Sequence, residues 1–255
     1  MRNILEIAKR ELAGYFATPI GWIILCLFLV LTGFFFASMV GYFAMQTSSM
    51  AMNPYESGNV NLGEYLISPF YSNMGVILLM VCPIISMRLL SEDRRSRSME
   101  LLLTSPVSTT EIVVGKYLGG MGFVAVLLLA TAHYPVILYW LGSPDTGIVL
   151  CSYLSMLLLV GSFMAVGILT SAFTESQVAA AVGSFAILLL FWVASWADSS
   201  TSGAWSETLS YISMLSHMEQ IGKGLIHLKD IVYYATFILV ALFATHQRVE
   251  AYRWR

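Results

Sequence analysis

The stretch "LLSEDRRSRSMELLLTSPVSTTEIVVGK", residues 89–116, gathers three arginines, one lysine and four acidic residues. The chain as a whole is very apolar, with 58% hydrophobic and 11% charged residues. Soluble domains contain about half apolar and about a quarter charged residues. The composition therefore indicates a membrane protein in which residues 89–116 form a polar hairpin between two membrane spans.

Six apolar stretches are long enough to cross a bilayer as helices, which takes about 20 residues each. None has a charged residue in its middle, and none alternates polar and apolar residues as a strand would. The sequence thus predicts an all-α membrane protein, a single domain over 1–255 with six transmembrane helices. The predicted spans are 20–45, 66–88, 117–141, 147–172, 177–197 and 230–247.

The distribution of basic residues predicts the orientation of the spans. If both termini and the hairpin face the cytoplasm, 11 of the 13 Lys and Arg residues lie on that side. Only Lys223 and Lys229 lie outside. The positive-inside rule strongly prefers this arrangement, so we expect both termini to be cytoplasmic.

Two segments are expected to lie along membrane surfaces rather than to cross. Residues 1–18 include "RNILEIAKRELAGYFATP", whose apolar residues fall on one helical face and whose basic residues fall elsewhere. This pattern is typical of a helix lying at the inner membrane surface. Residues 198–229 place Leu215 and Met218 at helical spacing, so we expect short helices at the outer interface.

Residues 89–116 can form a helix, a turn and the start of a second helix. We expect the first helix to begin after Ser91, with Glu92 and Asp93 in its first turn, where the helix dipole favours acids. Pro106 breaks it. Ser108 or the following threonine can cap the next helix, which runs into the third span.

The first of these helices is expected to carry apolar residues between charged flanks. Met99, Leu101 and Leu102 are its apolar residues. Basic residues alone would anchor the topology, without a capped helix and exposed leucines. We therefore interpret this helix as a docking site for a cytoplasmic partner.

Motifs of enzyme active sites are absent from the sequence. There is no Gly-x-x-x-x-Gly-Lys-Ser/Thr loop, no Gly-x-Ser-x-Gly elbow and no His-Glu-x-x-His. Cys26, Cys82 and Cys151 are widely spaced in apolar stretches, which favours neither disulfides nor zinc. "GKYLG" at 115–119 has the Gly-x-x-x-Gly spacing of close helix contacts, with lipid-facing and intramolecular roles both open. We expect no catalytic residue and no cofactor or metal on this chain.

Two further features are left open. His133 lies in a span just before Pro135, as a functional group or as a hydrogen-bonded neutral side chain at a proline kink. Met45, Met50 and Met52 cluster just outside the first span. Thioethers bind Cu(I), but methionine is also an ordinary filler of apolar space.

The stretch "SEDRRSRSMELLLTSPVSTTEIVVGKYLG" resembles the type-2 ABC exporter permeases. That family has an acidic-basic stretch, a glutamate-leucine run, a Ser-Pro-Val/Ile-Ser turn and an Ile-Val-x-Gly-Lys leading into the third span. The likeness covers essentially the whole chain, although "RRSRSME" has serine where many relatives carry glycine and threonine. The tail "MLSHMEQIGKGLIHLKDIVYY" is most similar to the gliding-motility (GldF-like) branch, which is close to permeases for multicopper enzyme maturation.

The resemblance implies half of an ATP-driven exporter in a bacterial inner membrane. ATP and Mg would bind to separate ABC ATPase subunits. A second permease copy or paralogue would complete the path, an auxiliary membrane-anchored extracytoplasmic subunit would be a further partner, and nucleic acid would not be one. The ATPase-coupling residues implied for this chain are Arg10, Glu11, Glu92, Arg95, Met99, Glu100, Leu101 and Pro106.

Two other classes of function remain as alternatives. A secondary transporter would run without ATP, but it would be expected to place several acids inside its spans. We expect no acid inside the spans of this chain, which argues against that class. A membrane scaffold or assembly factor, for gliding machinery or copper-enzyme maturation, would not need a capped docking helix.

The basic-residue distribution makes a testable prediction about sidedness. Single cysteines at Asn59 and Ser96, in a background without the native cysteines, should react with an impermeant thiol reagent from opposite sides of the membrane. Labelling of intact cells and of inverted vesicles measures this. Labelling of both positions in intact cells would overturn the predicted topology.

Overall fold

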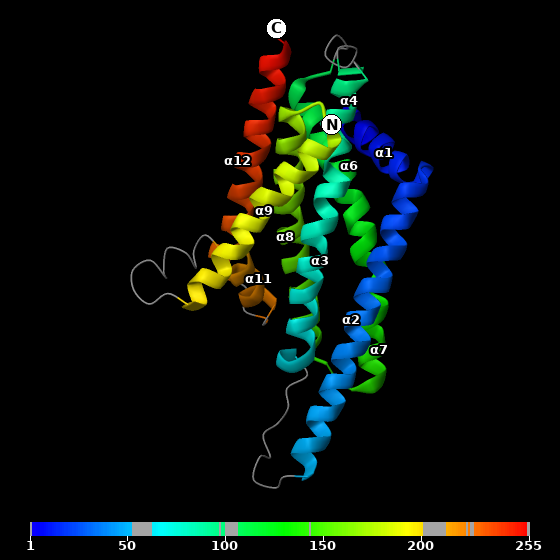
Figure 1. Ribbon diagram of the computed structural model, residues 1–255, viewed down its shortest axis with the longest axis vertical. Coiled ribbons are helices and arrows are strands. Elements are labelled where there is room, and N and C mark those ends of the chain that lie inside the picture. Colours follow the sequence, from blue (N-terminus) through cyan, green and yellow to red (C-terminus); the bar gives the residue numbers. More distant parts are fainter. Residues whose placement is uncertain are drawn as a thin grey trace.

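The computed structural model describes residues 2–52, 63–96, 98–99, 107–142, 144–200, 213–222, 224 and 227–253. These residues form helices and connecting turns and include no strand, which confirms the all-α class (Figure 1). The elements are α1 (Arg2–Ala17), α2 (Pro19–Met52), the π-helical turn η1 (Gly63–Ile67), α3 (Ser68–Ser86), α4 (Arg88–Arg95), α6 (Thr109–Ala130), α7 (His133–Leu141), α8 (Thr146–Phe173), α9 (Gln177–Ser200), α11 (Met214–Gly222) and α12 (Leu228–Arg253).

Five stretches within the described residues are long and apolar enough to cross a membrane. The apolar part of α9, Gln177–Val193, is shorter than these five. The predicted count of six spans is therefore not confirmed, although each predicted stretch corresponds to a helix. The five candidate spans are Pro19–Ser49, Tyr65–Arg95, Thr109–Trp140, Thr146–Phe173 and Leu228–Tyr252.

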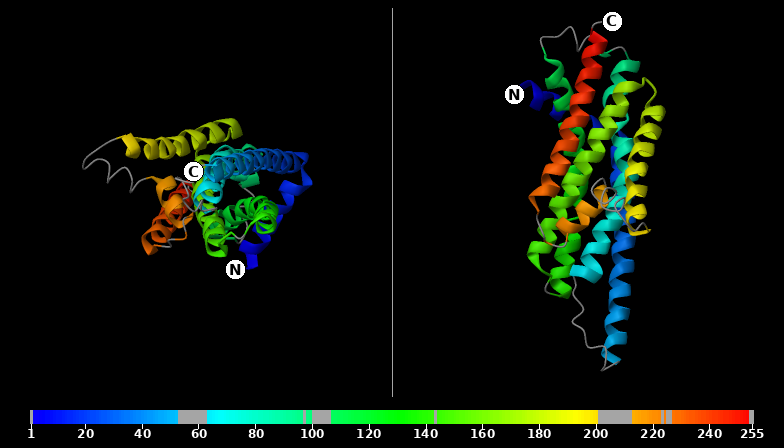
Figure 2. Two further views of the ribbon diagram at one scale, coloured as in Figure 1. Left: turned by 90° about the horizontal axis from the view of Figure 1, so that it is seen from below. Right: turned by 90° about the vertical axis from the view of Figure 1, so that its left-hand side faces the viewer.

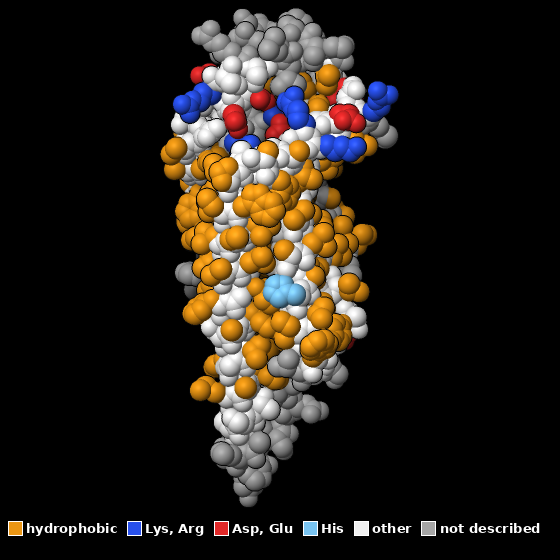
Figure 3. Space-filling view, turned by 90° about the vertical axis from the view of Figure 1, so that its right-hand side faces the viewer, with side chains coloured by type: hydrophobic (Ala, Val, Ile, Leu, Met, Phe, Trp, Pro, Cys, Tyr) orange, Lys and Arg blue, Asp and Glu red, His pale blue; other side chains and the backbone are white. Residues whose placement is uncertain are grey.

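The long helices run along the length of an elongated bundle, and α1 lies across it near one end (Figures 1 and 2). Both termini and α4 lie toward that same end. Acidic and basic side chains gather there, above a broad apolar surface (Figure 3). We call this the charged end. Its composition fits the prediction that both termini and the hairpin share one side of the membrane.

The core of the bundle is built around α3, α6 and α8. Within the most apolar stretch of each span, 72% of the residues are buried in Tyr65–Arg95 and 61% in Thr146–Phe173. The corresponding shares are 17% in Pro19–Ser49 and 22% in Leu228–Tyr252. The peripheral helices α2 and α12 therefore present most of their apolar surface to lipid or to another protein.

The N-terminal helix α1 packs closely against the first half of α6. A Cβ added at Gly115 would lie 2.9 Å from the Cβ of Ile7, and one added at Gly119 would lie 2.6 Å from the Cβ of Glu11. Only glycine allows this approach, so the Gly-x-x-x-Gly pair serves a contact within the chain. Leu5, on the expected apolar face of α1, is 57% exposed. Whether α1 also lies at the membrane surface stays a prediction.

The tight approach of α1 to α6 can be tested with two glycine substitutions. Gly119→Ala should destabilise the protein by about 1–3 kcal/mol, because the new methyl group overlaps Glu11. Gly41→Ala in α2 is the matched control, since an added Cβ there meets nothing within 4 Å. Thermal unfolding in detergent measures both. Equal unfolding temperatures for the two variants would contradict the close packing.

Candidate functional site

The hairpin begins with α4, which follows α3 after a single residue, Met87. The helix spans Arg88–Arg95, so Glu92 and Asp93 lie in its second half. The prediction of a helix that begins after Ser91, with both acids in its first turn, was wrong. The chain keeps helical dihedral angles at Met87, φ −54° and ψ −33°, so α4 starts directly from the end of α3.

The start of α4 is capped from a distant part of the chain. The hydroxyl of Ser171, near the end of α8, accepts hydrogen bonds from the N–H groups of Leu90 (3.0 Å) and Ser91 (2.9 Å). The same hydroxyl donates to the carbonyl of Met87 at 2.9 Å. The two N–H groups belong to the first turn of α4, where helical N–H groups lack intrahelical partners. Ser171 thereby fixes the hairpin onto α8.

A buried lysine joins three helices beneath the hairpin. The Nζ atom of Lys116, in α6, lies 2.6 Å from Oε1 of Glu11 in α1 and 2.6 Å from Oδ2 of Asp93 in α4. The lysine side chain is 2% exposed, and each carboxylate side chain is 15% exposed. Removing one partner of a buried ion pair strongly destabilises the folded protein, because the other charge is left buried without a counter-ion. Lys116 therefore holds α1, α4 and α6 together as one unit.

A second set of contacts joins α1 to the start of α4. The Arg88 guanidinium lies 4.7 Å from the centre of the Tyr15 ring, and its Nε is 3.4 Å from Oε2 of Glu92. Burial raises the pKa of the Tyr15 hydroxyl, which stays neutral and donates to the carbonyl of Ile85 at 2.8 Å. The Tyr15 ring also stacks on Phe123, with ring centres 4.8 Å apart.

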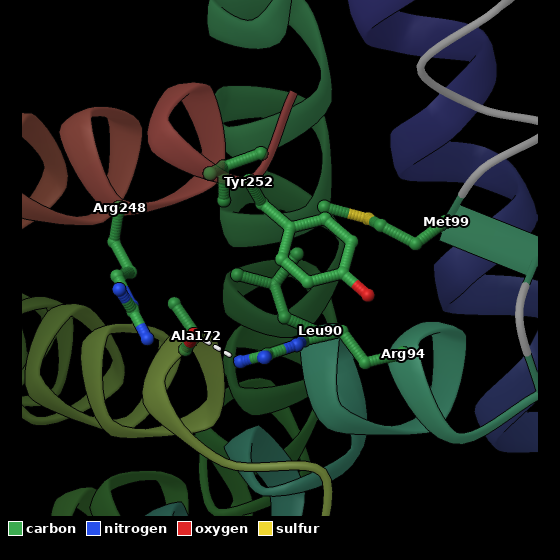
Figure 4. A pocket seen from close by; sticks show the side chains of 7 residues that line it. Leu90, Arg94, Met99, Ala172, Arg248 and Tyr252 are labelled. Carbon is green, nitrogen blue, oxygen red and sulfur yellow. Dashed lines mark hydrogen bonds between the residues drawn. The ribbon is translucent and has the colours of Figure 1, made fainter. Parts of the chain in front are cut away.

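The docking interpretation placed Met99 on the surface of the hairpin. In the structure Met99 is buried instead. It is 2% exposed and lines a pocket formed by the chain itself (Figure 4). The expectation of an exposed methionine was wrong, because Met99 shares this pocket with residues of α4, α8 and α12. The lining residues are Leu90, Arg94, Met99, Ala172, Arg248, Val249 and Tyr252.

The second helix of the hairpin begins as the sequence predicts. Ser108 is the N-cap of α6: its hydroxyl accepts from the N–H of Glu111 at 3.2 Å. Oε2 of Glu111 accepts from the N–H of Ser108 at 3.1 Å, which completes a capping box. Asn3 of α1 donates to the same carboxylate, and Thr109 donates to Glu250 of α12.

The remaining predicted coupling residues divide into two groups. Arg10, Glu92 and Arg95 are exposed on α1 and α4, which the Lys116 ion pairs bring together. Glu11 follows Arg10 in the sequence, but its carboxylate forms an ion pair with Lys116 inside the chain. The other three lie outside the described residues: Glu100, Leu101 and Pro106.

The structure contains a buried histidine–aspartate pair that the sequence did not predict. Asp230, in the first turn of α12, is fully buried, and its Oδ1 lies 2.6 Å from Nδ1 of His217 in α11. Its Oδ2 is also buried and has no hydrogen-bond partner among the described residues. The sequence predicts no acid inside the spans. Asp230, which is buried at the start of the last span, corrects this prediction. The two residues share no periodic pattern, so no local signal reveals them.

His133 lies at the break between α6 and α7. Its Nδ1 is 2.7 Å from the carbonyl of Ala130, and its side chain is exposed. This is the hydrogen-bonded arrangement expected beside a proline kink. Within the residues that the structure describes, no group of three or more His, Cys, Asp and Glu side chains could hold a metal ion.

Comparison with known families gives one match. Residues 5–246 match the model of a family described as ABC-2 family transporter protein. That range includes α1, the hairpin and most of α12. No curated protein matches the chain.

The Lys116 ion pairs predict a large effect of removing the cation. Lys116→Met should destabilise the protein by about 3 kcal/mol or more, because it leaves two partly buried carboxylates without a counter-ion. Lys9→Met, at an exposed lysine of α1, should change the stability by less than about 0.5 kcal/mol. Thermal unfolding in detergent measures both.

The triple variant Lys116→Met, Glu11→Gln, Asp93→Asn separates charge from packing. It should recover most of the stability lost in Lys116→Met, because no unpaired charge is left. If the triple variant unfolds at the same temperature as Lys116→Met, the ion pairs are not the source of the loss.

Proposed function

The chain belongs to the ABC-2 transporter family, and from that premise we propose that it is the permease subunit of an ATP-driven exporter. It would lie in a bacterial inner membrane with both termini in the cytoplasm. Two permease chains, identical or paralogous, would form the path. Membership of the family implies an ABC ATPase partner in general. We assign the binding of ATP and Mg to that partner, because this sequence has no phosphate-binding loop.

The observation that carries the proposal is the union of α1 and α4 at the charged end. A permease driven by another protein needs a stiff element there, since a flexible one would absorb the movement. Lys116 supplies the stiffness by pairing with Glu11 of α1 and Asp93 of α4. The Arg88 stack on Tyr15 adds a second connection between the same helices.

The surface of this unit suits a protein partner. Arg10 on α1 and Glu92 and Arg95 on α4 are exposed, so charges of both signs face outward. Protein interfaces commonly place such charges at a polar rim around an apolar centre. We propose that Leu101 supplies the apolar centre together with the neighbouring Pro106, with Glu100 at the rim. Met99, which the chain itself buries, supports the hairpin from beneath.

The finer assignment rests on the sequence of the tail alone. "MLSHMEQIGKGLIHLKDIVYY" resembles the gliding-motility branch, so we propose a role there or in multicopper enzyme maturation. An auxiliary membrane-anchored extracytoplasmic subunit is part of the same proposal. The buried Asp230 beside His217 weakens the argument against a secondary transporter, which relied on the absence of acids from the spans. Family membership favours the ATP-driven reading.

Docking of the ATPase can be tested with two hairpin variants. Leu101→Asp should reduce the ATPase that co-purifies with the chain by about tenfold or more, since truncating a central interface anchor costs at least about 2 kcal/mol. Arg97→Ala, in the charged flank, should reduce it by less than about threefold. Co-purification is measured beside the amount of permease in the membrane.

Two results would count against the permease assignment. One is full retention of the ATPase and of transport by Leu101→Asp. The other is robust ATP hydrolysis by the purified chain in a preparation shown to be free of other subunits.

A further inference from the structure

The last turns of α12 are held by both arms of the hairpin. From α4, the Arg94 guanidinium lies 5.0 Å from the centre of the Tyr252 ring. Met99 points toward Tyr252 (Figure 4), and both residues line one pocket together with Val249. From the start of α6, the Thr109 hydroxyl donates to a carboxylate oxygen of Glu250.

Arg94 fixes the relative position of these elements through three contacts. Its Nη1 donates to the carbonyl of Ala172 at 2.7 Å, at the end of α8, where helical carbonyls lack intrahelical partners. Its Nη2 lies 3.7 Å from Oε1 of Glu175, and its side chain is 11% exposed. A largely buried guanidinium that meets a carbonyl, a carboxylate and an aromatic face at once has one geometry that satisfies all three. Of these contacts only the one to Tyr252 lies on α12, because Ala172 and Glu175 belong to the end of α8 and the segment that follows it. Arg94 is thus fixed mainly to the end of α8 and holds α12 through the Tyr252 ring.

The other end of α12 is held by α11. Asp230 in the first turn of α12 pairs with His217 at 2.6 Å, with exposures of 0% and 5% for the two side chains. One turn further on, the Tyr234 hydroxyl donates to the carbonyl of Met214 at 2.6 Å. The His217 ring stacks on Tyr233, with ring centres 4.3 Å apart. Polar and aromatic contacts thus fix the short helix to the start of α12.

Between these two ends, α12 is an uninterrupted helix. It spans the 26 residues Leu228–Arg253, a length of about 39 Å at 1.5 Å per residue. The segment contains neither proline nor glycine, the usual causes of kinks. Only 22% of its most apolar stretch is buried, so most of its middle faces away from the bundle, although one side packs along α8.

We propose that α12 is a rigid connection between the cytoplasmic hairpin and α11, so that a movement of the hairpin is delivered to the far side of the membrane. The proposal rests on the ATP-driven permease function given above. Arg94, Met99 and Tyr252 are positioning residues at one end, and His217 and Asp230 are positioning residues at the other. Opening or closing around α11 would then follow the state of the ATPase.

The packing of α11 on α8 supplies the competing route. Both α11 and α12 lie against α8, and α11 contacts α8 more extensively than it contacts α12. This contact includes one hydrogen bond, from the Ser152 hydroxyl of α8 to the carbonyl of Gly222 at 3.4 Å. The contacts of Asp230 with His217 and of the Tyr234 hydroxyl with the Met214 carbonyl are shorter, at 2.6 Å each, and fix α11 at two points on α12. The test must therefore separate transmission through α12 from transmission through α8.

The experiment uses the complex of this chain with its ATPase in lipid vesicles. A single cysteine replaces Gln220 of α11, which is half-buried, in a background without the native cysteines. Its labelling rate with a maleimide should change by about fivefold or more between the nucleotide-free and the vanadate-trapped complex. Tyr252→Ala should reduce this change to less than about twofold while ATP hydrolysis persists.

Three variants control for general damage. Tyr252→Phe keeps the ring that Arg94 contacts, so it should retain the change in labelling. Phe243→Ala removes an aromatic side chain from the same helix at a position that is 64% exposed, and it should also retain the change. At the other end, His217→Phe keeps the stack on Tyr233 but removes the bond to Asp230, and it should abolish the change.

The double variant Tyr252→Ala, His217→Phe tests whether the two ends belong to one connection. The ends lie about 33 Å apart along α12, so independent effects on labelling would add. A single connection that is already broken at one end should lose nothing more at the other. The double variant should therefore match either single variant.

Each remaining outcome has one meaning. If Tyr252→Ala hydrolyses ATP and the labelling still changes fully, α8 carries the movement and the proposal fails. Loss of ATPase binding in Tyr252→Ala would also count against it, because the pocket would then shape the docking surface instead. If the parent chain binds no ATPase at all, it is the permease function that fails.

Discussion

The arrangement of the charged end depends on one ammonium group, Nζ of Lys116, placed between two carboxylates. Removing these charges from water is costly, and such a pair is weak evidence for stability by itself. Its effect lies in position. Glu11 reaches the lysine only because Gly119 lets α1 approach α6 so closely. The glycine spacing, the crossing of α1 and the ion pairs to Asp93 are therefore one constraint, and none of them would persist in this form without the others.

The charges of the hairpin have two separate roles. Asp93 and Arg94 turn inward, toward Lys116 and toward the end of α8, and both are largely buried. Glu92 and Arg95, on the same short helix, remain exposed. A topology anchor would need only the outward charges. The inward ones instead fix the hairpin to α6, α8 and α12, so that these elements form one unit at the charged end.

Local patterns predicted the helices and a cap at Ser108 or Thr109, because each depends on residues within one or two turns. The Gly115–Gly119 spacing was visible in the sequence, but its partner helix was not. Features that join distant segments could not be predicted in this way. The cap on α4 comes from Ser171, 80 residues beyond Ser91 in the chain. The burial of Met99 depends likewise on the end of α12. The surface of the site was thus partly predictable from the sequence, whereas its internal support was not.

The bilayer explains why a few polar contacts can decide which helices move together. Lipid tails are as apolar as leucine, so apolar helix surfaces gain little by choosing each other over lipid. Although α12 also packs along α8, its lipid-facing surface therefore gives it no preferred neighbour. Its ends do, because Asp230 has its hydrogen-bond partner in His217, and Glu250 accepts from Thr109. On the proposal that α12 is a rigid connection, these polar ends would pass a displacement along the helix in parallel with its packing on α8.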